Sequence, residues 1–313
     1  MIKKRKLVLD VLFNIPNLFF ILTLACFLFP SKYAAEMRSG LKSPLVFSVV
    51  LFTVEFFFLL QARNEKKWQT AKDISSFIFI VFFVWELFVS RLNVFPYVFV
   101  PALENVFYVF VQDWRQIIQG FFSSMLLLLT GMTSAIISAV ILGTLVGWNP
   151  RLTKAIYPIA KAVSTVPPLI YTPYVVLILP TFRMASIFVI FLTNFWSTFM
   201  GSINNTAFVE GRIVNSAKVL NLSTPVILFK VIIPYNLPRI INGLPIHLAS
   251  ALMTLTAAEM LGAESGMGFY VRMSLNFANY TKAITGIIFI GFVVTGLNAL
   301  INLAKKRLIK WNY

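Results

Sequence analysis

Long apolar runs constrain this chain more than any other feature of its sequence. Each run is nearly free of charge, and about 20 apolar residues in a helix that rises 1.5 Å per residue cross the hydrocarbon core of a bilayer. Lipid offers the backbone no hydrogen-bond partner, so such runs are expected to be helical. The sequence therefore predicts an all-α membrane protein with about eight transmembrane helices. The predicted spans cover residues 8–29, 44–60, 74–89, 121–148, 162–179, 184–203, 240–261 and 283–303.

The basic residues indicate which side of the membrane each loop faces. Cytoplasmic loops carry an excess of lysine and arginine. If both termini are cytoplasmic, nineteen of the 27 lysines and arginines fall on the inner segments. We therefore predict cytoplasmic N- and C-termini. The net charge of +16 is then a topology signal, and no nucleic-acid partner is predicted, because the basic residues cluster in short loops between apolar runs.

Residues 207–238 form an amphipathic segment between two predicted spans. The pattern predicts a short surface helix that ends at Asn221, because asparagine tolerates the left-handed conformation common just past helix ends. Ser223 and Thr224 are expected to cap a second helix that starts at once. The segment is thus a predicted helix pair to which a partner could dock. The apolar positions of its first helix, at helical spacing, are Val209, Ile213, Ala217 and Leu220.

Four ionisable residues lie within the predicted spans. A charged side chain at the bilayer centre costs about 2.5–3.5 kcal/mol on insertion scales, so each needs a reason. Glu86 and Glu259 lie near span ends and are expected to reach the interface or a partner helix, and Glu55 is expected to be structural. His247 is either a hydrogen-bonded packing residue or part of a substrate path.

A candidate translocation path gathers polar residues and a proline pair. Pro167 and Pro168 lie near the start of the fifth predicted span, where they indicate either a broken helix that lines a pathway or a proline in the first turn of a helix. Hydroxyl and amide side chains in the next two spans could hydrogen-bond many solutes. The candidate path residues are Pro167, Pro168, Asn194, His247, Ser250 and Thr254.

Enzyme chemistry lacks its usual residues in this sequence. Cys26 is the single cysteine and His247 the single histidine, and no close acidic pair joins them. Catalytic residues, metal ligands and a bound cofactor are therefore not predicted. The glycine-rich residues 262–268, GAESGMG, do not match a phosphate-binding loop, and we expect a flexible turn there.

The amphipathic segment resembles the cytoplasmic loop of bacterial ABC importer permeases. That loop has the pattern Glu-Ala-Ala, three residues, Gly, nine residues, Ile, one residue, Leu-Pro. The spacing matches this chain, but Asn215 stands at the glutamate position and Asn221 at the glycine position. The matched positions are Asn215, Ser216, Ala217, Asn221, Val231, Ile233 and Pro234.

The flanking sequence resembles the nitrate, sulfonate and taurine branch of that family. The similar stretches are residues 237–271 and 303–311, and residues 85–106 resemble the first core helix of the branch and the stretch after it. Residues 177–186, LILPTFRMAS, depart from the branch, which usually has a tryptophan-phenylalanine-glycine segment there. The resemblance covers most of the chain after the first two predicted spans.

The resemblance implies a six-helix type I importer core with two extra N-terminal helices. Residues 1–73 would be an N-terminal extension with a basic linker, 74–119 the first core helix and an outer amphipathic segment, 120–306 the permease core, and 307–313 a cytoplasmic tail. The coupling helices would span about residues 207–233. The residues expected to contact the ATPase are Asn215, Ser216, Ala217, Asn221, Leu222, Ser223 and Thr224.

The implied function is ATP-driven import of a small solute across the bacterial cytoplasmic membrane by alternating access. A cytoplasmic ABC ATPase dimer would carry ATP and magnesium, a solute-binding protein would deliver cargo outside, and a second identical or homologous permease would complete the pore in the lipid bilayer. Two alternatives are a structural or sensory membrane subunit and an enzyme acting on lipid or polyprenyl substrates. The sequence does not identify the transported solute.

Overall fold

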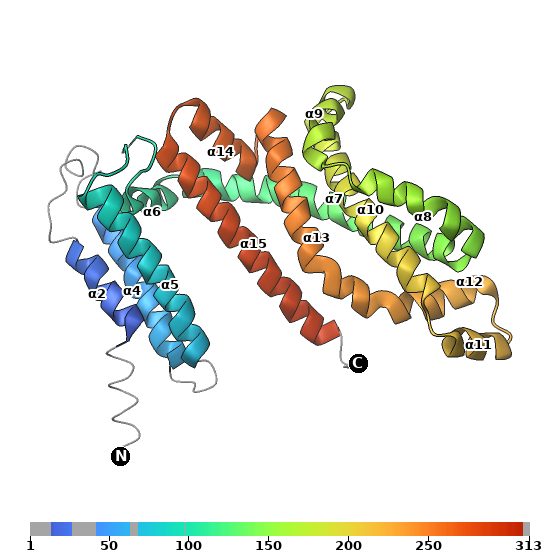
Figure 1. The fold of residues 1–313 in the computed structure, drawn as a ribbon. Coiled ribbons are helices and arrows are strands. Elements are labelled where there is room, and N and C mark those ends of the chain that lie inside the picture. The colour runs from blue at the N-terminus through green and yellow to red at the C-terminus, as the bar shows by residue number, and fades with distance from the viewer. Residues whose placement is uncertain (1–13, 27–41, 63–67, 97, 309–313) are drawn as a thin grey trace, which may run out of the picture. The chain divides into compact units, whose positions relative to one another are not determined.

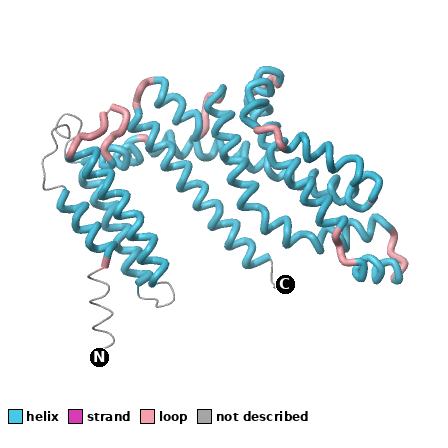
Figure 2. The backbone as a smooth tube through the Cα atoms, viewed as in Figure 1, coloured by secondary structure: helices cyan, strands magenta, loops and turns pink. Residues whose placement is uncertain are grey.

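A computed structural model describes residues 14–26, 42–62, 68–96 and 98–308 of the chain. All the regular elements in these ranges are helices (Figures 1 and 2), as the apolar runs predict. The chain divides into two units, described separately below. The first unit comprises residues 1–115 and 273–285, and the second comprises residues 116–272 and 286–313.

The first unit is built on an aromatic core between its helices. Its elements are α2 (Ile15–Cys26), α4 (Lys42–Ala62), α5 (Trp68–Trp85), the π-helix η1 (Glu86–Arg91) and α6 (Leu103–Gln112). Phe47 of α4 is fully buried and stacks on Phe107 of α6, with ring centroids 5.6 Å apart. Leu51, Phe79 and Leu103 complete the buried cluster. The outer amphipathic segment expected within residues 74–119 thus contains the helix α6, which buries its apolar side.

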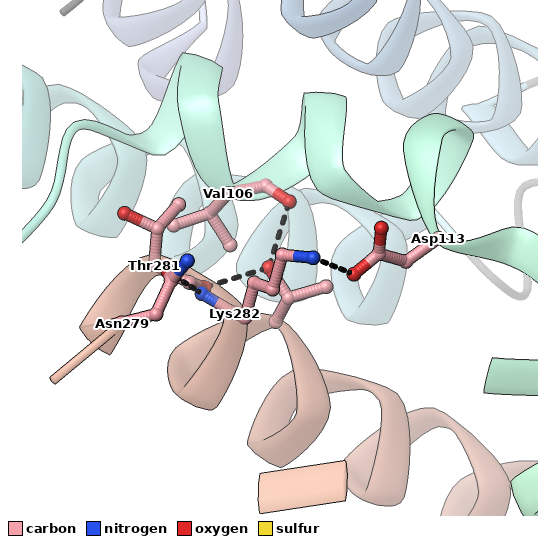
Figure 3. Close-up of polar contacts among 6 residues, drawn as sticks. Val106, Asp113, Asn279, Thr281 and Lys282 are labelled. Carbon is pink, nitrogen blue, oxygen red and sulfur yellow. Dashed lines mark hydrogen bonds and ion pairs between the residues drawn. The ribbon is translucent and has the colours of Figure 1, made fainter. Parts of the chain in front are cut away.

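The first turn of α15 (Tyr280–Leu308) belongs to this unit and holds α6 in place (Figure 3). Thr285 donates a buried hydrogen bond to the carbonyl oxygen of Val106 (3.0 Å). Lys282 Nζ lies 2.7 Å from Asp113 Oδ2, and the Lys282 backbone N–H donates to Asn279 Oδ1 (3.1 Å). Residues about 170 positions apart in the chain are thus joined by specific polar contacts.

Glu86 is fully buried in this unit and is paired on its own helix. One carboxylate oxygen accepts from Arg91 (2.8 Å) and the other from Ser90 (2.9 Å). The sequence predicted that Glu86 would reach the interface or a partner helix, and this is wrong for a local reason. The wider π-helical turn brings the side chains at i+4 and i+5 to the same carboxylate.

The second unit contains the remaining helices. In this unit α10 contacts α8, α9 and α13. A stripe of small residues every four positions along α7 faces α10. At Gly143 an added Cβ would lie 2.6 Å from Ser202 Cβ and 2.8 Å from the Phe199 carbonyl oxygen, so the two backbones approach closely. The elements are α7 (Trp114–Trp148), α8 (Pro150–Ser164), α9 (Pro168–Ile178), α10 (Phe182–Ala207), α11 (Gly211–Val219), α12 (Thr224–Val226), the π-helix η2 (Ile227–Ile232), α13 (Ile233–Gly262), α14 (Met267–Asn276) and α15.

Six helices in the described ranges are long and apolar enough to cross a membrane, or seven if α8 and α9 together make one span. The first predicted span, residues 8–29, lies partly outside the described residues, and its described part is the shorter apolar helix α2. The predicted count of eight is therefore not reached by the described residues alone.

The fifth predicted span, residues 162–179, is not one straight helix. α8 ends at Ser164, α9 begins at Pro168, and the two helices meet at 88°. Pro167 is the N-cap residue of α9 and Pro168 is its first residue. Proline lacks the N–H that would continue the helix and disfavours helical geometry in the residue before it. A break between two helices and a proline in the first turn of α9 are thus present together.

Candidate functional site

The turn between α11 and α12 has the geometry that the sequence predicted. Asn221 has a positive φ of 51°, in the left-handed region. Its N–H donates to the Lys218 carbonyl oxygen (2.9 Å), and the N–H of Leu222 donates to that of Ala217 (3.3 Å). This pattern closes a helix with a left-handed residue just past its end. Asn221 therefore adopts the left-handed conformation that glycine adopts readily at the end of a helix.

The second helix of the pair differs from the prediction in two respects. Thr224 to Gly262 runs as a single 39-residue helix, so the second helix is the start of the next apolar helix and not a separate element. Ser223 is the N-cap residue, but its side chain makes no capping hydrogen bond. The predicted side-chain cap is therefore wrong, and the proline at position 225 already fixes the first turn.

Ala217 and Leu220 have opposite environments, although both belong to the apolar stripe predicted for the first helix of the pair. Ala217 is 4% exposed and packs with Ile227, Leu228 and Ile232 at the base of the long helix. Leu220 is 71% exposed, so the apolar stripe is not buried along its whole length. α11 is nine residues long, and its last turn carries Leu220 past the contact with the long helix.

The remaining predicted coupling residues lie on the outside of this helix pair. Asn215, Ser216, Asn221, Ser223 and Thr224 are exposed, and Leu222 is half-buried. Val219, which the sequence analysis did not select, is 83% exposed beside Leu220. An exposed apolar pair next to polar side chains is typical of a surface that binds another protein.

A cavity of about 360 Å³ lies between the α8–α9 bend and α10. The bend forms one wall because the break at Pro167 and Pro168 turns α9 away from the axis of α8. One side of α10 forms the other wall. The lining residues are Val163, Ser164, Val166, Pro168, Tyr171, Leu192, Thr193, Trp196 and Ser197.

A chain of weak polar contacts connects this cavity to α13. Tyr171 Oη lies 3.4 Å from Thr193 Oγ1, and Thr193 Oγ1 lies 3.4 Å from Thr254 Oγ1. The two ring nitrogens of His247 lie 3.5 Å from Ser197 Oγ and 3.4 Å from Thr198 Oγ1. These distances are long for hydrogen bonds, so the contacts can rearrange easily.

The structure brings together only part of the predicted path. Pro168 lines the cavity, and His247 and Thr254 contact residues of its wall. Asn194 is buried and donates to the Ile190 carbonyl oxygen (3.0 Å), and Ser250 donates to that of Ile246 (3.1 Å). Each of these two bonds returns to the residue's own helix. Pro167 is the exposed residue beside Pro168.

Sequence reasoning missed most of the polar wall of the cavity. Thr193, Trp196 and Ser197 lie at i, i+3 and i+4 of α10, which places them on one helix face. That spacing was visible in the sequence. The contributions of Ser164 and Tyr171 were not, because they depend on the bend between α8 and α9.

Glu259 organises the turn between α13 and α14. Its Oε1 accepts from Ser124 of α7 (2.6 Å), and its Oε2 accepts from the N–H of Gly268 (2.7 Å). Ser124 Oγ accepts in turn from the N–H of Met267 (2.9 Å). Gly266 has a φ of +133°, and a Cβ there would overlap the Glu259 carboxylate. The turn expected to be flexible is therefore held by a buried acid, whose partner is indeed a neighbouring helix.

The described part of the chain contains no group of three His, Cys, Asp or Glu side chains that could hold a metal ion. The candidate site is thus an exposed helix pair, a long helix and an uncharged cavity.

Comparison with known proteins gives a consistent result. A probable ABC transporter permease protein of Brucella melitensis biotype 1 is 29% identical over 196 residues, which cover 63% of this chain and 80% of the relative. The nitrate import permease protein NrtB of Leptolyngbya laminosa is 28% identical over 245 residues, 74% of this chain and 85% of the relative. The bicarbonate transport system permease protein CmpB of Synechocystis is 32% identical over 164 residues, 52% of this chain and 59% of the relative.

The family described as the binding-protein-dependent transport system inner membrane component matches residues 135–311. The match takes in the bent helix pair, the cavity, α11 and the whole of α13, and it covers more than half of the 313 residues. The chain therefore belongs to the binding-protein-dependent transport system inner membrane components, the permeases of ABC importers.

Proposed function

We propose that this permease imports a small solute by alternating access, driven by a separate ABC ATPase that docks on α11. The observation that carries the proposal is the exposed pair Val219 and Leu220, next to Asn215 and Ser216, on a helix fixed to the base of the 39-residue helix. In this proposal both termini and α11 face the cytoplasm, as the distribution of basic residues favours.

The packing of α11 supports a route for coupling. Ala217 is buried against Ile227 and Leu228. A displacement of α11 is therefore transmitted to the start of the long helix through packed side chains and not through a flexible linker. The 39-residue helical run comprises α12, η2 and α13, contains Pro238 and Pro245, and bends between α12 and the upper part of α13 (Figure 1). It carries His247 and Thr254 beside the cavity. Motion of α11 would then shift His247 and Thr254 against the α10 wall of the cavity.

The proposal includes three partners. ATP and magnesium would bind to the cytoplasmic ATPase dimer, an extracytoplasmic binding protein would deliver the solute, and a second identical or homologous permease in the bilayer would complete the pathway. The permeases compared above are named for nitrate and bicarbonate, which supports small solutes as cargo.

The test is retention of the ATPase by variants of the exposed pair. We expect Leu220→Asp to lower the amount of ATPase that co-purifies with the permease by roughly tenfold or more, the effect of losing about 1.4 kcal/mol of binding free energy. Leu220→Met keeps the apolar contact and is the matched control. Equal ATPase recovery with Leu220→Asp and the native chain would contradict the docking site.

Ala217 requires a different interpretation from Leu220. Because Ala217 is buried in the packing of the helix pair, Ala217→Asp would disturb the fold of the segment as well as any interface. Substitutions of the exposed residues therefore test the interface with the ATPase without disturbing the packing of the helix pair. Insertion of each variant in the membrane is checked by extraction in detergent and a single elution peak.

A further inference from the structure

We infer that the cavity between the α8–α9 bend and α10 binds a small uncharged heteroaromatic compound that carries N–H or O–H donors. The cargo class of this permease would then differ from the inorganic anions for which NrtB and CmpB are named. The inference rests on the proposed transport function, because it takes the cavity as part of the solute path.

The lining of the cavity carries no formal charge. Val163, Val166, Pro168 and Leu192 are apolar, and the other five lining residues are neutral side chains with a hydroxyl or an indole N–H. A desolvated anion is costly in such surroundings unless a cation or several donors compensate it. Lys161, one turn before Ser164 on α8, is exposed and is not a lining residue.

Three of the four lining hydroxyl groups donate to carbonyl oxygens of their own helix. Ser164 donates to the Lys161 carbonyl oxygen (2.9 Å), Thr193 to that of Val189 (2.8 Å) and Ser197 to that of Asn194 (3.3 Å). A hydroxyl that donates in this way still offers oxygen lone pairs. Three of the five polar lining side chains therefore present acceptor oxygens, whereas Tyr171 and Trp196 each carry a donor. A ligand with donors fits this wall better than nitrate, which can only accept.

The aromatic side chains complete the match to a ring compound. Tyr171 comes from the first turns of α9 and Trp196 from α10, so an aromatic residue lies in each wall. Aromatic rings interact favourably with other rings in stacked or edge-to-face arrangements. The indole N–H of Trp196 is a donor suited to a ring nitrogen of the ligand.

The size of the cavity agrees with an organic ligand. A volume of about 360 Å³ is equivalent to about twelve water molecules at about 30 Å³ each. It lies at the lower end of the range of about 300–1,000 Å³ that is usual for small-molecule sites. Nitrate and bicarbonate have four heavy atoms each and would leave most of this space to water.

The experiment uses protection of a single reporter cysteine. Cys26 is the one cysteine of the chain, so Cys26→Ala provides a cysteine-free background in the full-length permease. Ser197→Cys then places a thiol in the wall of the cavity, and Ser216→Cys on α11 is the exposed control. The rate of labelling by a maleimide is measured with cytosine, sodium nitrate, sodium bicarbonate or sodium methanesulfonate present.

We expect cytosine to slow labelling of Ser197→Cys by roughly fivefold or more, because a ligand in such a site has most of its surface buried. Labelling of Ser216→Cys should not change, and the three anions should not protect either thiol. Adding Trp196→Ala should remove the protection by cytosine, whereas Trp196→Tyr should keep it.

Protection by any of the anions equal to that by cytosine, or no protection by cytosine, would overturn the inference. Failure of Ser197→Cys to react at all would also overturn it, because the cavity would then be closed to solutes. ATPase co-purification with the same variants separates the two proposals. If the ATPase is retained and cytosine does not protect, only the cargo class is wrong.

Discussion

The hydroxyl of Ser124 on α7 donates a 2.6 Å hydrogen bond to the carboxylate of Glu259 on α13, 135 residues further along the chain. Both residues are fully buried. The second carboxylate oxygen accepts the N–H of Gly268, so the acid fixes the end of the long helix to a neighbouring helix and to the next turn. If α11 receives the ATPase, Glu259 holds the opposite end of the same 39-residue helix.

Glu259→Ala should destabilise the protein by about 2–4 kcal/mol, because it leaves buried polar groups on Ser124 and Gly268 without an acceptor. Glu259→Gln keeps an acceptor for one of these two groups, so its free energy of unfolding should fall by clearly less. Thermal unfolding in detergent measures the stability of both variants. Equal unfolding temperatures for Glu259→Ala and the native chain would show that the contact is not stabilising.

Gly143→Ala and Gly201→Ala should have opposite effects on stability. The new methyl at position 143 would meet Ser202 Cβ and the Phe199 carbonyl oxygen at 2.6 and 2.8 Å, so α7 and α10 must separate at a cost of about 1–3 kcal/mol. At Gly201 nothing lies within 4 Å of the new atom, and the higher helix propensity of alanine should stabilise by up to about 1 kcal/mol. Unfolding temperatures of the two variants, compared in one detergent, check this contrast; similar shifts would refute it.

Asn221→Gly should keep both the stability of the helix pair and the binding of the ATPase, since glycine adopts the left-handed conformation without strain. Asn221→Val should lower the free energy of unfolding by about 1–2 kcal/mol, because a β-branched residue is strained in the left-handed conformation. Limited proteolysis reports opening of this segment. Asn215→Val, on the exposed side of α11, is the control for loss of an asparagine side chain. Equal protection of Asn221→Val and the native chain would rule out the strain.

The ion pair between Lys282 and Asp113 should contribute only modestly. Lys282 keeps 32% of its side chain exposed and Asp113 10%. Lys282→Met should therefore lower the free energy of unfolding by about 0.2–1 kcal/mol. The difference in stability between this variant and the native chain should shrink in high salt. The double exchange Lys282→Asp with Asp113→Lys should restore part of the loss. A larger, salt-independent loss would instead indicate a packing defect around the neighbouring Thr285 bond.

The sequence alone was sufficient for the helical class and for several local features. An apolar run of about 20 residues must satisfy its backbone within itself in lipid, so the long helices follow from composition and spacing. The left-handed Asn221 follows from the preferences of a single residue, and the break at Pro167 and Pro168 follows from the missing proline N–H. These features depend on atoms within a few residues of one another.

The tertiary structure decided which side chains meet. It buried Ala217 and exposed Leu220, joined Ser124 to Glu259, and placed Tyr171 opposite Trp196 across one cavity. Each of these facts depends on how the helices cross and where they bend. Periodicity shows which face of a helix is apolar, but it does not show which neighbouring helix covers that face, because that choice is made by packing between residues far apart in the chain.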